Sequence, residues 1–285
     1  SGSFAPKGKP PGTAMNAGEV AGWAWWGFMA MISLANCLVL ALSLRATQLE
    51  TLLRPRCEAV VTRSAASIFT VVCMYRSLCP RVDVPRQCWF GSPANWIIFG
   101  RLSATVAEVA WAMQMGLLLR RLAICMHDQG LIRPRSRRCS SAAGVAVISV
   151  ACFAECWSWT NLITENNVFA VAEQALWCAL FLLTGIGIGL LLPLWPMRPR
   201  SYCLFVFIVI AIGLEQAYEA FGLYLPRFLD DQAHGVQYQG FFRGLRKLAS
   251  CKLVTNDIRD WAGDAPWMTG YFSVGVWSSI WLAVA

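Results

Sequence analysis

The sequence predicts an all-α fold: a transmembrane helical bundle of about seven spans, with one amphipathic helix at the membrane surface. The 285-residue chain is 57% hydrophobic and only 14% charged, whereas soluble domains average about 25% charged residues. Its mean hydropathy is +0.50. Seven separate segments are also long enough to cross a hydrocarbon core, which needs about 20 residues of apolar helix.

The first three spans are predicted from continuous apolar segments. The second span carries Arg63 near one end and Arg76 near the other, and the third carries Arg101 and Glu108. Charged residues inside a membrane are costly and usually have a partner or a function, so these spans are expected to contact one another through polar side chains. The expected ranges are 21–44, 59–78 and 95–119.

The last four spans are bounded in part by proline. Pro193 is expected to end the fifth span and Pro226 the sixth, because proline cannot continue a helix. The expected ranges are 141–163, 168–194, 202–225 and 267–285. Residues 19–285 therefore form a single transmembrane domain, with a long connection over 225–266 and a flexible N-terminal segment over 1–18.

The long connection contains one amphipathic segment, residues 240–254. Phe241, Leu245 and Leu248 recur there at helical spacing. The polar side is basic and consists of Arg243, Arg246, Lys247 and Lys252. A basic amphipathic helix lies in the plane of the membrane surface, with anionic lipid headgroups as its expected partner. The alternative is a soluble helix that contacts another subunit.

The topology is predicted from short loops, because lysine and arginine favour the cytoplasmic side. The loops after the first, third and fifth spans are rich in arginine: Arg45, Arg54, Arg56, Arg120, Arg121, Arg133, Arg135, Arg137, Arg138, Arg198 and Arg200. The tight connection between the fourth and fifth spans has none. The N-terminus is therefore expected on the side opposite these loops, and the C-terminus on the same side as them.

Half of the 12 cysteines lie within predicted spans (Cys37, Cys73, Cys152, Cys156, Cys178 and Cys203), where a free thiol behaves as a small hydrophobic group. Cys79 and Cys88 share one loop and are the candidate disulfide pair. No C-x-x-C pair occurs, so zinc is not an expected cofactor.

Five glutamates lie inside the predicted spans, which is the most unusual feature of the chain. The candidate intramembrane polar cluster consists of Arg76, Arg101, Thr105, Glu108, Glu155, Glu173, Glu215 and Glu219. Three interpretations are open: a structural network of ion pairs, a path for a polar substrate or protons, and ligation of a cofactor metal.

The third span places three of these residues on one helical face. Arg101, Thr105 and Glu108 recur at i, i+4 and i+7. At 1.5 Å per residue, Arg101 and Glu108 are about 10 Å apart along the helix axis, which predicts that they do not pair directly. Each is expected to contact another helix. The candidate partners are Glu155, Glu173 and Glu219 for Arg101, and Arg63 and Arg76 for Glu108.

Tryptophans accompany the glutamates. Trp111, Trp157 and Trp177 each follow a glutamate within about one turn, and Trp159 lies beside Trp157. An aromatic belt at the membrane surface explains such residues without a binding function. The alternative is a wall for a ring-shaped or isoprenoid ligand, formed by Trp111, Trp157, Trp159 and Trp177. Glutamate, Gln114 or Gln174 are the candidate ligands for the magnesium of a chlorophyll.

Several functional classes are not expected. The two histidines, His127 and His234, fall in predicted loops, so haem held by two histidines within the bundle is excluded. The segment 267–285 lacks the lysine that a retinal Schiff base needs. The chain contains no HExxH, GxSxG or P-loop motif. It also contains no recognisable nucleic-acid-binding module. The basic loops do not require one, because anionic lipid headgroups explain them.

Four segments carry a resemblance to known sequences. They are residues 73–81 (CMYRSLCPR), 100–108 (GRLSATVAE), 155–159 (ECWSW) and 267–277 (WMTGYFSVGVW). Together they resemble an uncharacterised family of polytopic membrane proteins of bacteria and algae. The resemblance implies a shared core with Arg76, Arg101, Glu108 and Glu155, and it implies no function. Light-harvesting proteins are not indicated, because their helix motif has glutamate before arginine.

The sequence favours a non-catalytic integral membrane subunit of an organellar energy-transducing complex, with photosynthesis as the favoured process. Such a subunit binds lipid, and chlorophyll or carotenoid are its candidate pigments. The 14 tryptophans, the lack of a catalytic motif and a first residue other than Met support this, since a removed transit peptide leaves such a start. The thylakoid is the favoured membrane and the mitochondrial inner membrane the second.

The alternative function is a transporter or membrane enzyme for a small polar or lipid-like substrate, which uses the Arg/Glu cluster. The direction of the glutamates distinguishes the two functions. Carboxylates that face outward favour pigments and partner subunits, whereas a cluster in the interior favours the transporter or enzyme.

Overall fold

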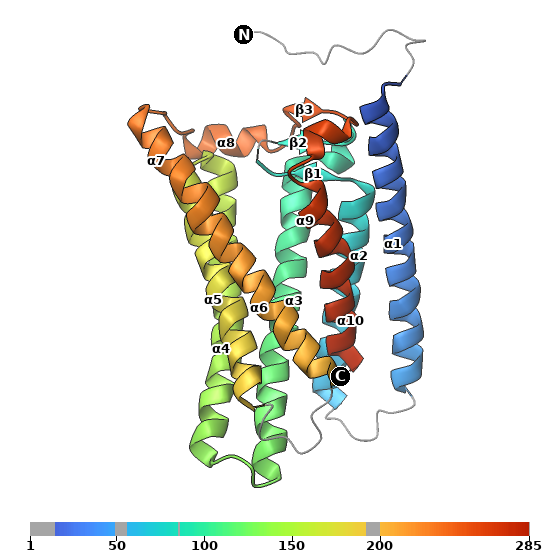
Figure 1. Ribbon diagram of the computed structural model, residues 1–285, viewed down its shortest axis with the longest axis vertical. Helices are drawn as coiled ribbons and strands as arrows, with labels where there is room; N and C mark the ends of the chain where they lie inside the picture. The colour runs from blue at the N-terminus through green and yellow to red at the C-terminus, as the bar shows by residue number, and fades with distance from the viewer. Residues whose placement is uncertain (1–14, 49–55, 85, 192–199, 285) are drawn as a thin grey trace.

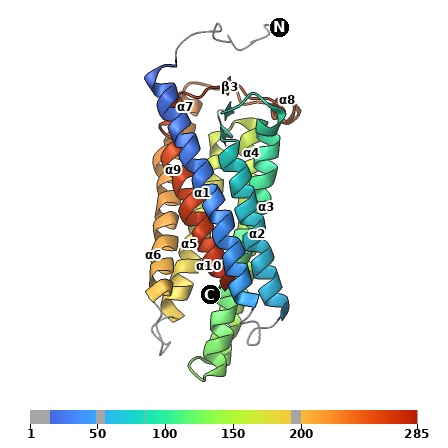
Figure 2. The same ribbon diagram turned by 90° about the vertical axis from the view of Figure 1, so that its right-hand side faces the viewer.

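The computed structural model describes residues 15–48, 56–84, 86–191 and 200–284. Long helices lie side by side (Figure 1, Figure 2), and the predicted all-α bundle is confirmed. Among these described residues, six helical segments are long and apolar enough to cross a membrane. The first five lie in α1 (Ala17–Gln48), α2 (Arg56–Leu78), α3 (Ile97–Asp128), α4 (Pro134–Thr164) and α5 (Asn167–Leu191), and the sixth begins with α6 (Arg200–Tyr218).

The seventh predicted span is not among these six. Its residues are helical throughout, in the order α9 (Ala265–Gly270), the π-helical turn η6 (Tyr271–Gly275) and α10 (Val276–Val284). This segment lies inside the bundle against α1 and α2 (Figure 2). Its small polar side chains Ser273, Ser278 and Ser279 are buried. A helix that faces other helices rather than lipid can carry such residues, and they lower its hydropathy. The predicted count of seven exceeds the six apolar helices by one.

The sixth helix continues past Pro226, so the prediction that this proline ends it is wrong. α6 is followed directly by the π-helical turn η4 (Glu219–Tyr224) and by α7 (Leu225–Ala233). Pro226 lies in the first turn of α7, where the missing N–H of proline is tolerated. The preceding π-helical turn changes the hydrogen-bond pattern from i+4 to i+5, which lets the helix continue through the proline.

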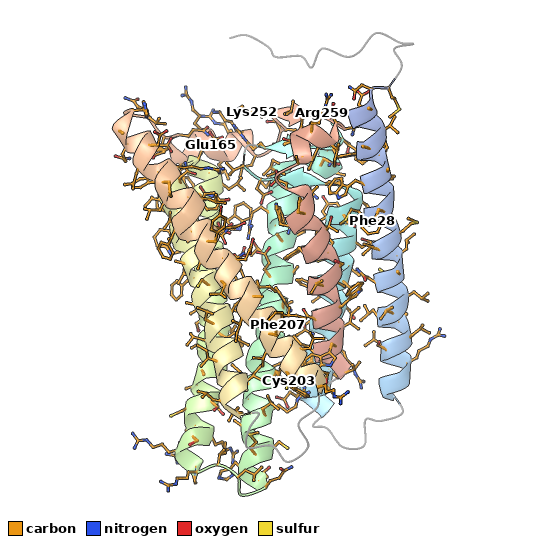
Figure 3. All side chains as sticks on the ribbon, viewed as in Figure 1. Phe28, Glu165, Cys203, Phe207, Lys252 and Arg259 are labelled. Carbon is orange, nitrogen blue, oxygen red and sulfur yellow. A yellow bond between two sulfur atoms is a disulfide. The ribbon has the colours of Figure 1, made fainter. Side chains whose placement is uncertain are left out.

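The outer surface of the bundle is apolar. On α1, Met31, Leu34 and Leu38 are all exposed and form one stripe at helical spacing. Phe28 on α1 and Phe207 on α6 also project away from the bundle (Figure 3). α3 occupies the centre: 56% of its most apolar stretch is buried, against 22% for α1. Exposed apolar surface on this scale is suited to hydrocarbon rather than water.

α3 and α4 approach each other closely through two glycines. A Cβ atom added to Gly116 would lie 2.4 Å from the carbonyl oxygen of Gly144, and one added to Gly144 would lie 2.5 Å from that of Gly116. Small residues at a helix crossing allow backbones to touch, which is a common way to join helices in membranes. The lower part of this helix pair is therefore held by backbone contact and dispersion.

Short elements from two distant parts of the chain form a cap at one end of the bundle. The cap consists of β1 (Arg81–Val82), β2 (Gln87–Cys88), η2 (Pro93–Asn95), α8 (Phe241–Lys247), β3 (Leu253–Val254) and η5 (Ile258–Trp261). β2 pairs with β1 in the antiparallel and with β3 in the parallel sense. Trp89 and Trp261 are buried with ring centroids 5.4 Å apart and extend the main hydrophobic core of the bundle into the cap.

A disulfide joins Cys88 to Cys251 within the cap, whereas Cys79 is free. The predicted pairing of Cys79 with Cys88 is therefore wrong. Cys79 directly follows α2, while β2 and β3 lie side by side and bring Cys88 to Cys251. The same connection shortens the predicted amphipathic helix of residues 240–254, which the structure limits to Phe241–Lys247.

The two ends of the bundle differ in charge and in chemistry. The cap and the first turn of α1 lie at one end, and the α3–α4 hairpin and the end of α10 lie at the other (Figure 1). Residues 15 and 284 are thus at opposite ends, as the loop charges predict. Disulfides form on the oxidising side of membranes, and arginine-rich loops favour the cytoplasmic side. If the helices cross a bilayer, both rules favour the non-cytoplasmic side for the cap.

Several predicted features lie outside the described residues. They include residues 1–14 of the predicted N-terminal segment, Pro193, and the loop residues Arg54 and Arg198.

Candidate functional site

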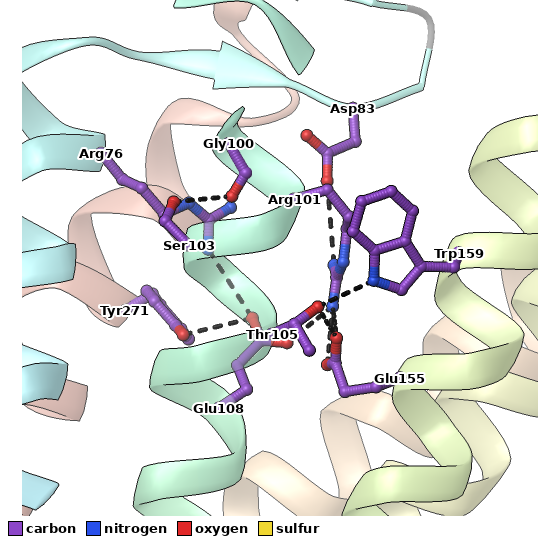
Figure 4. A network of polar contacts seen from close by, with 10 residues as sticks. All are labelled: Arg76, Asp83, Gly100, Arg101, Ser103, Thr105, Glu108, Glu155, Trp159 and Tyr271. Carbon is purple, nitrogen blue, oxygen red and sulfur yellow. Dashed lines mark hydrogen bonds and ion pairs between the residues drawn. The ribbon is translucent and has the colours of Figure 1, made fainter. Parts of the chain in front are cut away.

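In the half of the bundle next to the cap, polar side chains from several helices meet in one place (Figure 4). We call this group the Arg101 cluster. Its members come from α2, the β1–β2 loop, α3, α4, α5 and η6, and they are Arg76, Asp83, Arg101, Thr105, Glu108, Glu155, Ser158, Trp159, Glu173 and Tyr271.

Arg101 is the centre of the cluster. Its Nη2 atom donates hydrogen bonds of 2.6 and 2.5 Å to the two oxygens of Glu155 on α4. The same Nη2 atom also donates to Glu108 Oε2 over 2.9 Å. The expectation that Arg101 and Glu108 cannot pair within α3 is therefore wrong, because both side chains extend along the helix toward each other and span the axial separation.

Thr105 connects α3 to α4 between these two charges. Its hydroxyl donates to Glu155 Oε2 and accepts a hydrogen bond of 3.0 Å from Trp159 Nε1. The i+4 spacing from Arg101 places Thr105 on the same helical face. The carboxylate of Glu155 is thus bound by two side chains from one helix, and Trp159 covers them from the other.

Glu108 faces the opposite side of the bundle as well. Its Oε1 atom lies 3.6 Å from Arg76 Nη1 on α2 and accepts a hydrogen bond of 3.2 Å from the Tyr271 hydroxyl. The Arg76 guanidinium lies 5.7 Å from the centroid of the Tyr271 ring. Arg76, rather than Arg63, is the partner of Glu108 among the two candidates that the sequence offers.

Two more carboxyl groups border Arg101. Asp83 Oδ2 in the β1–β2 loop lies 3.7 Å from Arg101 Nη1. Glu173 on α5 is buried, is attracted by the Arg101 charge and accepts a hydrogen bond from Ser158. The sequence singles out Glu173 but not Asp83, Ser158 or Tyr271. The first two lie outside the spacing pattern of α3, and Tyr271 was expected only as part of an apolar span.

The cluster lies deep in the bundle. Arg101 and Glu108 are four and eleven residues past the start of α3, which places them roughly 6–16 Å below its N-terminal end. The side chain of Glu155 is 4% exposed and that of Asp83 is 20% exposed. Among the charged members of the cluster, the side chain of Asp83 is the most exposed and that of Glu155 the least.

Carboxyl groups outnumber guanidinium groups in the cluster. The acids are Asp83, Glu108, Glu155 and Glu173, and the bases are Arg76 and Arg101. Arg81 also attracts Asp83, and counting it still leaves one carboxyl group in excess. Arginine does not lose its proton in proteins, and an uncompensated buried charge is strongly destabilising. At least one carboxyl group must therefore hold a proton or face a further cation.

The other two predicted glutamates lie apart from this cluster. Glu215 on α6 is exposed on the outer surface and accepts a hydrogen bond of 2.5 Å from Gln216. Glu219, one turn later, is half-buried at the start of η4. The structure thus separates the five glutamates into an interior group of three and a pair at the junction of α6 and η4.

The four tryptophans predicted to form a ligand wall do not lie together. Trp111 and Trp177 are buried and both pack on Phe181, with centroid distances of 5.4 and 5.8 Å. Trp157 is exposed and stacks on Phe169, while Trp159 belongs to the Arg101 cluster. The prediction of one wall is wrong, because helical spacing on separate helices does not decide which faces meet.

The candidate pigment ligands differ in availability. Gln114 donates to Thr62 O and Ser279 O and accepts from the Ser279 hydroxyl, so its side chain is fully used. The Oε1 atom of Gln174 is buried without a hydrogen-bond partner among the described residues. Within residues 15–48, 56–84, 86–191 and 200–284, no group of three or more His, Cys, Asp or Glu side chains could hold a metal ion.

A scan against models of protein families finds no match for this chain, and searches of curated proteins and of solved structures find no significant similarity.

Proposed function

We propose that this protein is a membrane transporter that binds a small cationic or polar substrate at the Arg101 cluster in exchange for protons. The excess of carboxyl groups over guanidinium groups supports the proposal. A carboxyl group that cannot be balanced by arginine binds either a proton or a cationic group, so the two compete for one place. Such competition couples the movement of one to the movement of the other.

The arrangement of the charges supports a path from the cap into the bundle. Asp83, the most exposed of the charged members, lies in the cap and contacts Arg101. Arg101 in turn contacts Glu155 and Glu108, which lie deeper. Ionisable groups in series within a membrane are typical of proton and substrate pathways. The cluster consists of ion pairs with no activated nucleophile, which favours transport over the enzyme that the sequence also allows.

Proton flux into proteoliposomes tests the proposal. The protein is reconstituted with a pH-sensitive dye inside, a pH gradient is imposed, and small amines and amino acids are added one at a time. We expect at least one of them to cause proton movement that Glu155→Gln and Glu108→Gln abolish. Glu215→Gln makes the same chemical change outside the cluster and is expected to keep the flux.

Two controls make the result decisive. Each variant must elute as a single species and retain the Cys88–Cys251 disulfide, so that lost flux is not lost folding. Flux that persists in well-folded Glu155→Gln and Glu108→Gln would contradict the proposal, as would the absence of flux with the unmodified protein for every compound.

A subunit of a larger membrane complex is the second candidate, and the outer surface of α6 favours it. Glu215 is exposed there beside the exposed side chains of Tyr218 and Leu214. A carboxylate on a lipid-facing surface is costly without a partner, and a neighbouring subunit or a chlorophyll magnesium would supply one. This candidate includes the organellar, photosynthetic location that the sequence favours.

Purification from native membranes in mild detergent tests the second candidate. The expected result is a coloured complex, with co-purifying subunits identified by mass spectrometry and with pigment lost on Glu215→Ala. A colourless monomer would contradict it.

A further inference from the structure

α8 lies across the end of the bundle at the level where the transmembrane helices stop (Figure 1). A Cβ atom added to Gly244 would lie 1.7 Å from the carbonyl oxygen of Ile163, near the end of α4. Ile98, near the start of α3, donates its backbone N–H to Leu248 O over 3.1 Å. Both contacts hold α8 at the height of the lipid headgroups if the long helices cross the bilayer.

The seven residues of α8 divide into three faces. At 100° per residue, Gly244 and the following Leu248 share the buried face. The second face is apolar and exposed, and the side chain of Phe242 is 77% exposed. It consists of Phe241, Phe242 and Leu245. The third face is basic and exposed, and consists of Arg243, Arg246 and Lys247. We call the second and third faces together the α8 patch.

In the described part of the chain, the basic face has no acidic partner. Among the described residues, none of its three side chains forms an ion pair with a carboxylate. Arg246 Nε donates to Phe242 O over 3.3 Å. This bond uses only one of the N–H donors of the guanidinium group. Three cationic side chains beside two exposed phenylalanines are complementary to a membrane surface, in which anionic headgroups lie outside an apolar layer of acyl chains.

The arginine-rich α3–α4 hairpin lacks this combination. It projects beyond the other helices (Figure 1), and residues 129–140 contain no aromatic side chain. Its arginines, of which Arg135, Arg137 and Arg138 lie in the first turns of α4, therefore lie beyond the ends of the other helices rather than level with them. The sequence alone predicts that both basic regions contact lipid headgroups. In the structure only α8 lies level with the ends of the long helices.

We propose that the α8 patch binds the phosphate headgroups of anionic phospholipids on the cap side of the membrane, with Phe241 and Phe242 inserted among the acyl chains. Each basic residue near an anionic surface strengthens such binding roughly fivefold. The proposal concerns a different surface from the transport site and does not depend on it.

Lipid retention measured by native mass spectrometry tests the proposal. The full chain is incubated with equal amounts of phosphatidylglycerol and phosphatidylcholine that have the same acyl chains. We expect Arg243→Gln, Arg246→Gln and Lys247→Gln together to lower retained phosphatidylglycerol at least fivefold without changing retained phosphatidylcholine. The matched control changes the hairpin residues Arg135, Arg137 and Arg138 to Gln. Equal retention in the α8 variant, or an equal loss in the control, would overturn the proposal.

Photocrosslinking identifies the occupant directly. Phe242→benzoylphenylalanine is incorporated and the protein is irradiated in liposomes of the two lipids and in native membranes. A mass increase equal to one phospholipid is the expected product in both. A crosslink to another protein in native membranes, without a lipid adduct, would show that the patch is a protein interface and would overturn the proposal.

Discussion

The half of α3 next to the cap and the half next to the α3–α4 hairpin are held to their neighbours by different forces. In the cap half, Arg101 and Glu108 form ion pairs with α2 and α4. In the hairpin half, Gly116 meets Gly144 with no side chain between the backbones. The difference teaches that one helix can pack tightly on a partner in one half and place a charged site in the other.

The largest effect is expected in the cap half, from Arg101→Ala. Removing one partner of a buried ion pair leaves uncompensated carboxylates, which costs about 3–5 kcal/mol of unfolding free energy. Unfolding in mixed detergent micelles measures the loss. Arg135→Ala removes an exposed arginine from the hairpin and is expected to change the free energy by less than about 0.5 kcal/mol. Similar losses of unfolding free energy in Arg101→Ala and Arg135→Ala would show that the ion pairs of the cluster do not stabilise the fold.

The next largest effect concerns the cap itself. Replacing Cys88 and Cys251 by Ser together is expected to lower the unfolding free energy by about 2–4 kcal/mol. Hydrogen exchange should increase first in the cap, because its strands are only two residues long. The matched control, Cys139→Ser, changes an exposed free thiol and should leave both unaltered. An increase in hydrogen exchange that is equally large in the cap and in the α3–α4 hairpin would show that the disulfide does not stabilise the cap in particular.

A smaller effect is expected in the hairpin half. Gly116→Ala places a methyl group against the Gly144 backbone, and overpacking of this kind costs about 1–3 kcal/mol. Gly270→Ala is the matched control, since nothing lies within 4 Å of its added Cβ. Gly270 has helical dihedral angles, so alanine there is expected to stabilise the helix by about 0.5–1 kcal/mol. Thermal unfolding measures both changes in stability. A loss of stability in Gly116→Ala together with a gain in Gly270→Ala would support the close contact between Gly116 and Gly144.

The smallest effect is a dependence on pH at the junction of the cap with α1. Hydrogen bonds from the Arg259 side chain and backbone, and its charge, hold the pKa of Asp257 far below its usual value. A lowered pKa in the folded state stabilises the fold above the ordinary aspartate pKa of about 4, and this stabilisation is lost as the pH falls further. Asp257 also lies against Gly18 of α1.

Thermal unfolding between pH 7 and pH 3 measures this dependence. Asp257→Asn is expected to be less stable than the unmodified protein at pH 7, and the difference is expected to begin to shrink below about pH 4 and to remain in part at pH 3, because the folded-state pKa lies far below the ordinary value. Asp230→Asn, at an exposed position of α7, is the control. A constant difference between Asp257→Asn and the unmodified protein over this range would show that the aspartate charge contributes nothing.

The sequence predicts the long helices well, because a bilayer imposes a minimum apolar length on each. It fails where a helix faces other helices instead of lipid. The buried serines of α10 reduce the hydropathy of the last segment, and Pro226 is accommodated after a π-helical turn that no residue pattern announces. Hydropathy reports what contacts lipid, and these features are decided by contacts between helices.

The site is predictable only along single helices. The spacing of Arg101, Thr105 and Glu108 places them on one face, and the cost of buried charge implies partners for them. Asp83 enters the cluster through the cap, whose folding brings residues 81–96 to residues 248–261. That pairing, like the link between Cys88 and Cys251, depends on tertiary structure. The reach of the Arg101 side chain along its own helix also exceeds what axial spacing suggests.

The Cys88–Cys251 disulfide divides the chain into a closed ring and two arms. The ring contains everything from α3 to α8, and the arms carry α1 and α2 on one side and α9 and α10 on the other. Arg101, Glu108 and Glu155 belong to the ring, whereas Arg76, Asp83 and Tyr271 belong to the arms. A protease cut in the α3–α4 hairpin would therefore yield two polypeptides that migrate as one until a reductant is added.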